Sequence, residues 1–306
     1  MAKHVGIMTN EEAFGKQADL ESVIKKIGWN TTPFLSSIGT AAPTSRDAQV
    51  ALGHQWYYDE EPEGELDNAH LEGGAPAEAE YFTGGKLSNH YQIVKHTFGL
   101  SGSEEDSTTV DGKTVLASQL DKTSMKHKKT LEMILLSAQS PVQRVNTGVK
   151  VAGRCGGLKS FATANNTILA GGVDLNLQFI REIMKIGFFQ SVNYSKMQMG
   201  DKQMDIIDDL MNSKVLVNQW GMEQIADGVT RIKTKYGKCD LMLNPFLNDD
   251  EIIPYDPTLI KKVNWRPMHT KELGRTKDAI EKELISEFTL RVCHQYAFSW
   301  LKGLKV

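Results

Sequence analysis

The sequence predicts an α+β fold that carries a long outstretched hairpin, and three features of the chain lead to this prediction. Apolar residues return at helical spacing over roughly 27 residues from position 112, which indicates one long helix. The segment from Leu284 to Trp300 alternates apolar and polar side chains, which is the period of a strand facing a core. An acidic, glycine-rich segment of roughly thirty residues separates two strand-like stretches, and it is too long for a loop inside a compact domain.

The composition indicates a soluble folded protein. The 306 residues are 40% hydrophobic and 24% charged, which allows one large domain or two smaller ones. The net charge of -3 argues against a protein whose main task is to hold nucleic acid by neutralising phosphates. Any contact with DNA should therefore be local and weak.

Cysteine usage and hydropathy point away from export and from membranes. Cys155, Cys239 and Cys293 are widely separated and form no C-x-x-C pair, so we expect three buried, reduced thiols made in a cytoplasm. The N-terminal residues contain no apolar run of signal-peptide length, and no uninterrupted apolar stretch of about 18 residues occurs anywhere. We therefore expect a protein that is neither exported through a membrane nor embedded in one.

The first hundred residues predict two extensions. Residues 1 to 43 are mostly polar with one short apolar cluster, so they form an arm that needs a surface to lie on. Residues 48 to 58 alternate as a half-buried strand, and a second strand contains Val94, Phe98 and Leu100. The acidic segment between them then becomes the far end of an extended hairpin arm.

Helices and strands follow in a mixed order. Asp111 is the expected N-cap of the long helix, which should end near Ala138 and measure about 40 Å. Gly148 to Asn166 reads as a loop, and Asp174 is expected to cap a helix that contains Leu177 and Phe188. The next third predicts a helix at 204–211, a strand at 215–218, a helix at 219–227, and strands at 229–236, 239–243, 251–255 and 259–265.

No segment of the sequence matches a known catalytic, nucleotide-binding or metal-binding motif in full. DGKT at 111–114 suggests a phosphate loop, but Ser107 stands where the first glycine is required, so a helix cap is favoured. The cluster Gly153, Gly156 and Gly157 lacks dinucleotide-binding spacing, and no histidines form a tight ligand pair. The acidic runs lack the pattern of a calcium loop. We expect no catalytic residue, no cofactor and no metal.

A basic stripe lies on the predicted long helix. Lys122, Lys126 and Lys129 are spaced i, i+4 and i+7, so they share one helix face. They could contact DNA weakly, and a solvated face that pairs with a neighbour's carboxylates explains them equally well.

Several segments, in this order, resemble the major head proteins of tailed bacteriophages with the fold first described for phage Hong Kong 97. They are TTPFLSSIG at 31–39, HQWYYDE at 54–60, LEGGA at 71–75, YQIVKHTFGLSGS at 91–103, RCGGL at 154–158, and the stretch from NWRPM at 264 to EFTLRVCHQYAFSWLKGL. Each segment alone is weakly specific, and their joint order over nearly the whole chain carries the resemblance, which is to a subfamily without a fused scaffolding domain.

The resemblance implies a Hong Kong 97-like α+β capsid fold with four parts. These are an N-terminal arm at 1–43, an extended β-hairpin arm (E-loop) at 44–105, a peripheral domain at 106–166 and 263–306 with a spine helix at about 112–138, and an axial domain at 167–262. Some members of this fold crosslink a hairpin lysine to a neighbour's asparagine. Lys86 and Asn89 are candidates only by location, and we expect no crosslink.

The implied function is that of a major capsid protein without enzyme activity. Identical subunits would form pentamers and hexamers in an icosahedral virion shell around double-stranded DNA. Their partners would be a separate scaffolding protein, a portal protein at one vertex and an optional decoration protein. The short stretch before the spine helix leaves no room for a fused scaffold. The alternatives are another virion protein (portal, tail or decoration subunit) or a mixed α/β nucleotide-binding enzyme, for which DGKT is the only hint.

Overall fold

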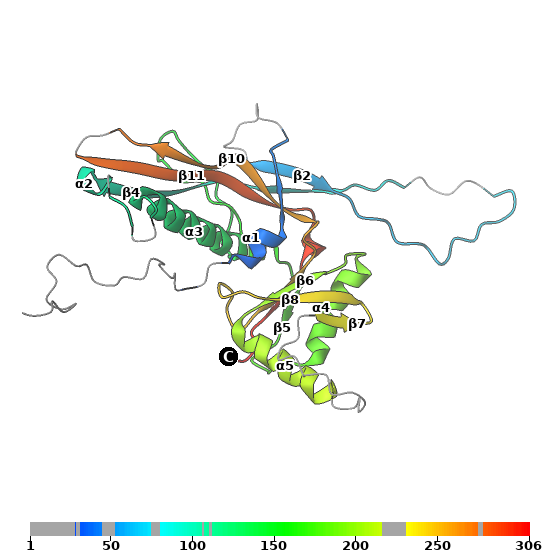
Figure 1. Ribbon diagram of the computed structural model, residues 1–306. Coiled ribbons are helices and arrows are strands. Elements are labelled where there is room, and N and C mark those ends of the chain that lie inside the picture. The colour runs from blue at the N-terminus through cyan, green and yellow to red at the C-terminus, as the bar shows by residue number, and fades with distance from the viewer. Residues whose placement is uncertain are drawn as a thin grey trace, which may run out of the picture.

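The computed structural model of the protein in Figure 1 describes most of the chain. The described residues are 28, 31–44, 53–74, 80–105, 107–109, 112–215, 231–274 and 278–306, without the side chains of 211–215. The predicted N-terminal arm lies mostly outside this range, as do the strand positions 48–52, the expected cap Asp111, and the helix at 219–227. No helix in the described part of the chain is both apolar enough and long enough to span a bilayer.

The first body is a four-stranded sheet covered on one face by the long helix (Figure 1). Strand β11 (Ala279–Val292) pairs antiparallel with β10 (Ile260–Glu272) on one side and with β4 (Gln92–Ser101) on the other. The short strand β1 (Gly39–Ala41) adds to β10 in parallel. Helix α3 (Val115–Leu136) lies over β4 and β11, while short helices α1 (Pro33–Ser37) and α2 (Gly102–Glu105) flank it.

Helix α3 is the predicted long helix with shifted ends. It begins at Val115, because the Thr114 side chain accepts a hydrogen bond from the Ala117 N–H and caps the first turn. The expectation of an Asp111 cap was therefore wrong. The helix stops at Leu136, where Ser137 turns extended, so its 22 residues measure about 33 Å rather than about 40 Å.

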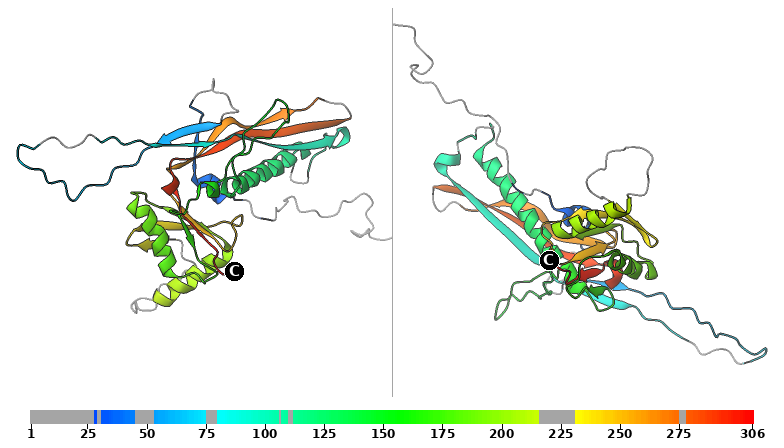
Figure 2. Two further views of the ribbon diagram at one scale, coloured as in Figure 1. Left: turned by 180° about the vertical axis from the view of Figure 1, so that it is seen from behind. Right: turned by 90° about the horizontal axis from the view of Figure 1, so that it is seen from below.

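The second body is a six-stranded sheet between two helices. Its strand order is β5 (Thr167–Leu169), β12 (Trp300–Lys302), β9 (Ile252–Tyr255), β6 (Lys196–Met199), β8 (Gly237–Leu243) and β7 (Arg231–Thr234). Helices α4 (Leu177–Phe189) and α5 (Asp201–Val215) lie on opposite sides of this sheet in the views of Figures 1 and 2. Both contribute to one apolar core, through Ile180, Ile183 and Met184 from α4 and Ile207 from α5.

Local expectations in the second body needed correction. The cap of α4 is Asn176, whose side chain accepts from the Phe179 N–H at 3.0 Å, and it is not Asp174. Val215 ends α5 and does not begin a strand. Strand β7 is shorter than the predicted 229–236 within the described residues, whereas β10 continues to Glu272, seven residues beyond the predicted end.

The C-terminal strand ends earlier than its alternation suggested. Strand β11 stops at Val292, a 3-10 turn follows (Gln295–Ala297), and β12 then enters the six-stranded sheet. Every residue from Leu284 to Leu290 is buried, because neither face of this stretch is open to water. The last two strands of the chain therefore lie in different sheets, β11 in the four-stranded one and β12 in the six-stranded one.

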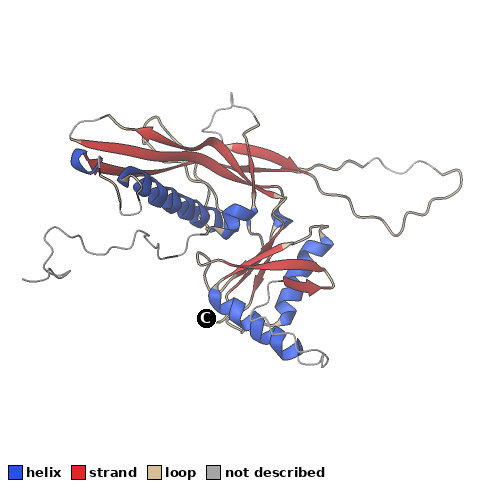
Figure 3. Cartoon of the chain, viewed as in Figure 1, coloured by secondary structure: helices blue, strands red, loops and turns tan. Residues whose placement is uncertain are grey.

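The hairpin arm is built differently from the prediction. Strand β2 (His54–Tyr58) pairs with β3 (Gly85–Asn89) as a separate two-stranded ribbon, and the chain between them extends far from both bodies (Figure 3). Strand β4, which had been read as the second hairpin strand, belongs to the four-stranded sheet instead. A 3-10 turn (Leu158–Phe161) closes the long loop after α3, beneath the ribbon.

Candidate assembly surfaces

The far end of the hairpin arm exposes large apolar side chains. All described residues from 59 to 84 are exposed. Among them Leu71 is 88% exposed, Tyr81 88% and Phe82 64%, and Leu66 is fully exposed. Large apolar groups that gather on one outstretched segment mark a surface that another molecule covers. The same segment carries Glu60, Glu61, Glu63, Glu65 and Asp67, which keep the uncovered arm soluble.

The base of the arm is fixed to β11. The Trp56 indole Nε1 donates to the Val292 carbonyl oxygen at 2.8 Å, and its ring packs near Phe161. The Asn89 amide donates to the carbonyl oxygens of Leu290 at 2.8 Å and Gly156 at 3.0 Å, and it accepts from the Gly156 N–H at 2.7 Å. Trp56 and Asn89 are both buried. The arm therefore leaves the body in a defined direction.

These contacts give Asn89 a structural role. Its amide is buried and bonded on both sides, which leaves it no free group to offer a neighbouring subunit. Lys86 lies on the arm, with its ammonium 5.9 Å from the centre of the Tyr57 ring. The geometry thus argues against a crosslink between two such residues.

A buried polar network holds α1 to both bodies. The Glu132 carboxylate on α3 accepts from the N–H groups of Phe34 and Leu35, each at 2.7 Å, and from the Asn244 amide at 2.7 Å. Asn244 also donates to the Gln198 side chain, which donates to the Tyr255 hydroxyl. Burial raises the pKa of Glu132, and the two backbone N–H groups and Asn244 oppose that shift.

Two further buried carboxylates tie loops to the sheets. Glu287 on β11 accepts from Arg144 at 2.5 Å and from Arg266 at 2.8 Å, which fastens the loop after α3 to the sheet. Glu251 pairs with Lys159 and also accepts from the Trp300 indole at 2.8 Å. Glu132 and Glu287 did not stand out in the sequence, because their partners lie far away along the chain and share no local pattern with them, whereas Glu251 stood out only as part of the acidic run 249–251.

A pair of histidines lies between α3 and the four-stranded sheet. The Nδ1 atoms of His96 and His127 are 3.0 Å apart, and His127 Nε2 lies 2.7 Å from the Ser286 hydroxyl. His127 is fully buried. Burial lowers the pKa of His127 to about 4, and the neighbouring His96 and Lys262 lower it in the same direction. At neutral pH the pair is therefore uncharged.

The lysine stripe faces away from this interface. Lys122 and Lys126 are exposed and Lys129 is half-buried. At 100° per residue they lie opposite the buried His127 and Leu131. Within the described residues none of the three makes an ion pair, so all three ammonium groups are available to an external anion.

The sequence motifs for chemistry have structural uses. Thr114 of DGKT caps α3, and the Lys113 ammonium lies 3.9 Å from the Asp121 carboxylate on the same helix. Both residues of the motif thus belong to the start of α3. A Cβ on Gly157 would lie 2.2 Å from the Ser137 carbonyl oxygen, so this glycine permits close backbone packing. Across the described ranges no three potential ligands gather to hold a metal ion. Cys155 and Cys239 are buried free thiols, whereas Cys293 is partly exposed, which corrects the expectation of three buried ones.

Comparisons with known structures show the fold. The capsid of an empty GTA particle is 11% identical, with 97% of this chain and 98% of that chain covered and a TM-score of 0.68. The cyanophage A-1(L) capsid is 12% identical, with 98% and 100% covered and a TM-score of 0.66. The SrpI encapsulin from Synechococcus elongatus PCC 7942 is 8% identical, with 94% and 93% covered and a TM-score of 0.61. The predicted Hong Kong 97-like α+β fold is therefore confirmed.

The fold alone does not separate a phage head from an encapsulin, so the sequence family decides. No curated protein sequence matches this chain. The family model described as the SU10 major capsid protein, however, matches residues 7–305, which is nearly the whole chain. The chain thus belongs to the SU10 major capsid protein family and is a shell protein of a phage head.

Proposed function

We propose that many copies of this chain close into an icosahedral head around packaged double-stranded DNA, and that the hairpin arm provides the main contact between neighbours. The exposed apolar side chains on an arm with a fixed base are the observation that supports this proposal. The work is mechanical, because assembly buries surface that one copy leaves open to water. No step of it requires catalysis or a cofactor.

Each of the two sheets forms the centre of one proposed domain. We assign the four-stranded sheet with α3 to the peripheral domain and the six-stranded sheet with α4 and α5 to the axial domain. The axial domain would then surround the five-fold and six-fold axes. Because one chain must fit both environments, the hairpin arm and the loop at 148–157 are expected to differ between copies.

The inner surface and the assembly partners complete the proposal. Lys122, Lys126 and Lys129 form an exposed basic stripe that would contact packaged DNA loosely if it faces the interior. Assembly in the host cytoplasm would involve a separate scaffolding protein and a portal at one vertex, with a decoration protein as an optional addition.

The arm is tested by replacing its apolar side chains. In Tyr81→Ser/Phe82→Ser the chain should fold normally, because both residues are exposed in the isolated subunit. Burial of each ring on a neighbour contributes about 2 kcal/mol, so their joint loss weakens each contact by about 4 kcal/mol and should abolish closed heads. Heads are counted by electron microscopy after expression with the other head genes, and folding is checked by thermal unfolding.

Val306→Ser is the matched control, since Val306 is also well exposed at 69% but lies on the body. It should leave the yield of heads unchanged. Normal heads from the arm variant would contradict the proposed role of the arm. Failure of both variants to fold or assemble, with wild-type heads present, would also count against it.

A further inference from the structure

The described surface of the second body carries an uncovered patch of aromatic and basic side chains. On α4, Phe188 is 54% and Phe189 67% exposed, and their rings meet edge to face at 5.9 Å. The Tyr236 ring, from the turn after β7, lies 5.5 Å from Phe188. We call this patch the basic–aromatic face, defined by Phe188, Phe189, Tyr236, Arg181, Lys185 and Lys235.

Cations surround these rings. The Lys185 ammonium lies 5.5 Å from the centre of the Phe189 ring, and the Lys235 ammonium lies 4.9 Å from that of Tyr236. Arg181, Lys185 and Phe188 are spaced i, i+4 and i+7, so they share one exposed face of α4. The nearest acidic group on this helix, Glu182, lies off this face and accepts from Gln178 at 2.8 Å.

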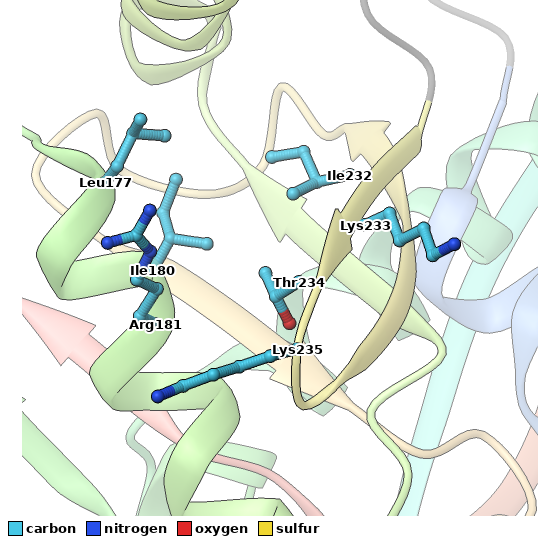
Figure 4. Close-up of a pocket in the computed structure, with 7 residues that line it drawn as sticks. All are labelled: Leu177, Ile180, Arg181, Ile232, Lys233, Thr234 and Lys235. Atoms are coloured by element: carbon cyan, nitrogen blue, oxygen red, sulfur yellow. The ribbon is translucent and has the colours of Figure 1, made fainter.

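A pocket of about 400 Å³ opens beside this face, between α4 and β7. Figure 4 shows Leu177 and Ile180 on α4 facing Ile232 on β7, with the Arg181 guanidinium beside Ile180 and the Lys235 side chain extending toward α4 at the lower end of the pocket. Lys233 points away from the pocket. An apolar floor with a cationic rim fits a short acidic side chain, because the stem packs against the floor while the carboxylate meets the cations.

The opposite side of the same sheet carries the complementary charge. Asp201, Asp205 and Asp209 on α5 are exposed and spaced i, i+4 and i+8, so they form one acidic face. The half-buried Asp208 and the half-buried Lys202 flank this face on either side, so its exposed charges are the three carboxylates. The views of Figures 1 and 2 show α4 and α5 separated by the six-stranded sheet.

We propose that the basic–aromatic face of one copy docks on the acidic face of α5 in the next copy, head to tail. This inference rests on the proposed shell function and names the residues that close its rings. Two unlike faces on opposite sides of one body cannot satisfy each other in a two-fold pair, which would bring like charges together. They are satisfied when each copy binds the next around a closed ring.

Charge reversal tests the pairing. Arg181→Glu/Lys185→Glu makes both faces acidic, and Asp205→Lys/Asp209→Lys makes both basic, so each variant alone should give at least about ten-fold fewer heads. The chain with all four changes exchanges the two charges at an unchanged net charge, and it should recover heads. Because every changed residue is exposed, thermal unfolding of all variants should match the wild type.

A mixture of the two reversed chains provides the sharper test. Attraction then exists only between unlike chains, so they must alternate around each ring. A ring of six can alternate, whereas a ring of five always retains one repulsive contact. Co-expression should therefore produce six-fold sheets or tubes and few closed heads, as seen by electron microscopy.

Several outcomes would overturn the inference. They are normal heads from either reversed chain, no recovery in the four-fold exchange, or closed heads from the mixture at the wild-type yield. The proposed function is tested by a different observation: it would be contradicted if the wild-type chain formed no heads under the same conditions.

Discussion

The buried carboxylate of Glu132 provides the most quantitative test of the structure. Its two oxygens accept from the N–H groups of Phe34 and Leu35 and from the Asn244 amide, and Glu132 is fully buried. Glu132→Ala removes all three acceptor contacts at once. The donors remain buried, since Phe34 and Asn244 are themselves fully buried.

The expected cost follows from those three donors. A buried donor left without an acceptor costs about 1 to 3 kcal/mol, and some of that is recovered by relaxation and by the lost desolvation of the carboxylate. The sum for Glu132→Ala is about 4 kcal/mol. Glu132→Gln keeps one carbonyl oxygen but turns an NH₂ group toward a backbone N–H, so we expect about 2 kcal/mol.

The assay is urea unfolding of the unassembled chain, followed by tryptophan fluorescence. Met133→Ala is the matched control, since Met133 is the next residue of α3 and is 58% exposed, so its loss should cost less than about 0.5 kcal/mol. A decrease below about 1 kcal/mol for Glu132→Ala would refute the reasoning. Equal effects of the Glu132 and Met133 changes would refute it as well.

Two further predictions concern the same helix. The pKa of His127 is lowered to about 4 in the folded chain, against about 6.5 when unfolded, so the unfolded state binds more protons in that window and the free energy of unfolding falls by about 3 kcal/mol as pH decreases from 6.5 to 4. His127→Gln should flatten this part of the stability curve, and a curve as steep as that of the wild type would contradict the assignment. Replacing Lys122, Lys126 and Lys129 by glutamine should reduce the slope of log affinity for DNA against log salt concentration by roughly three without affecting head formation. An unchanged slope would contradict the proposed contact of these lysines with DNA.

Local periodicity predicted those elements whose burial is one-sided. The apolar residues of α3 return along one face because this helix lies on a sheet with its other face in water, so the sequence alone indicated it. Its start was misjudged because Asp111 and Thr114 both suit an N-cap. Only the fold determines that Thr114 accepts the Ala117 N–H.

Strand pairing and the buried network could not be read in this way. The partner of β2 is β3, whose sequence GKLSN has little apolar alternation, whereas β4 alternates well but pairs elsewhere. Strand β11 is buried on both faces, so its alternation did not mark where it ends. Glu132, Gln198 and Asn244 come together only after both bodies have packed, and no spacing in the sequence relates them.

The base of the hairpin arm and the contacts of β11 connect the arm to both sheets. The arm is fixed at its base through Trp56 and Asn89 to β11, and β11 also carries Glu287 and Ser286, which bind the loop after α3 and the helix itself. In the proposed shell, a neighbour that covers the far end of the arm would therefore act on β11 through the paired base of the arm, β2 and β3. Strand β12 continues the same chain into the second sheet, so β11 connects the base of the arm to the sheet that carries α4 and α5 on its two sides. We therefore expect changes at the far end of the arm to alter the spacing of the proposed rings.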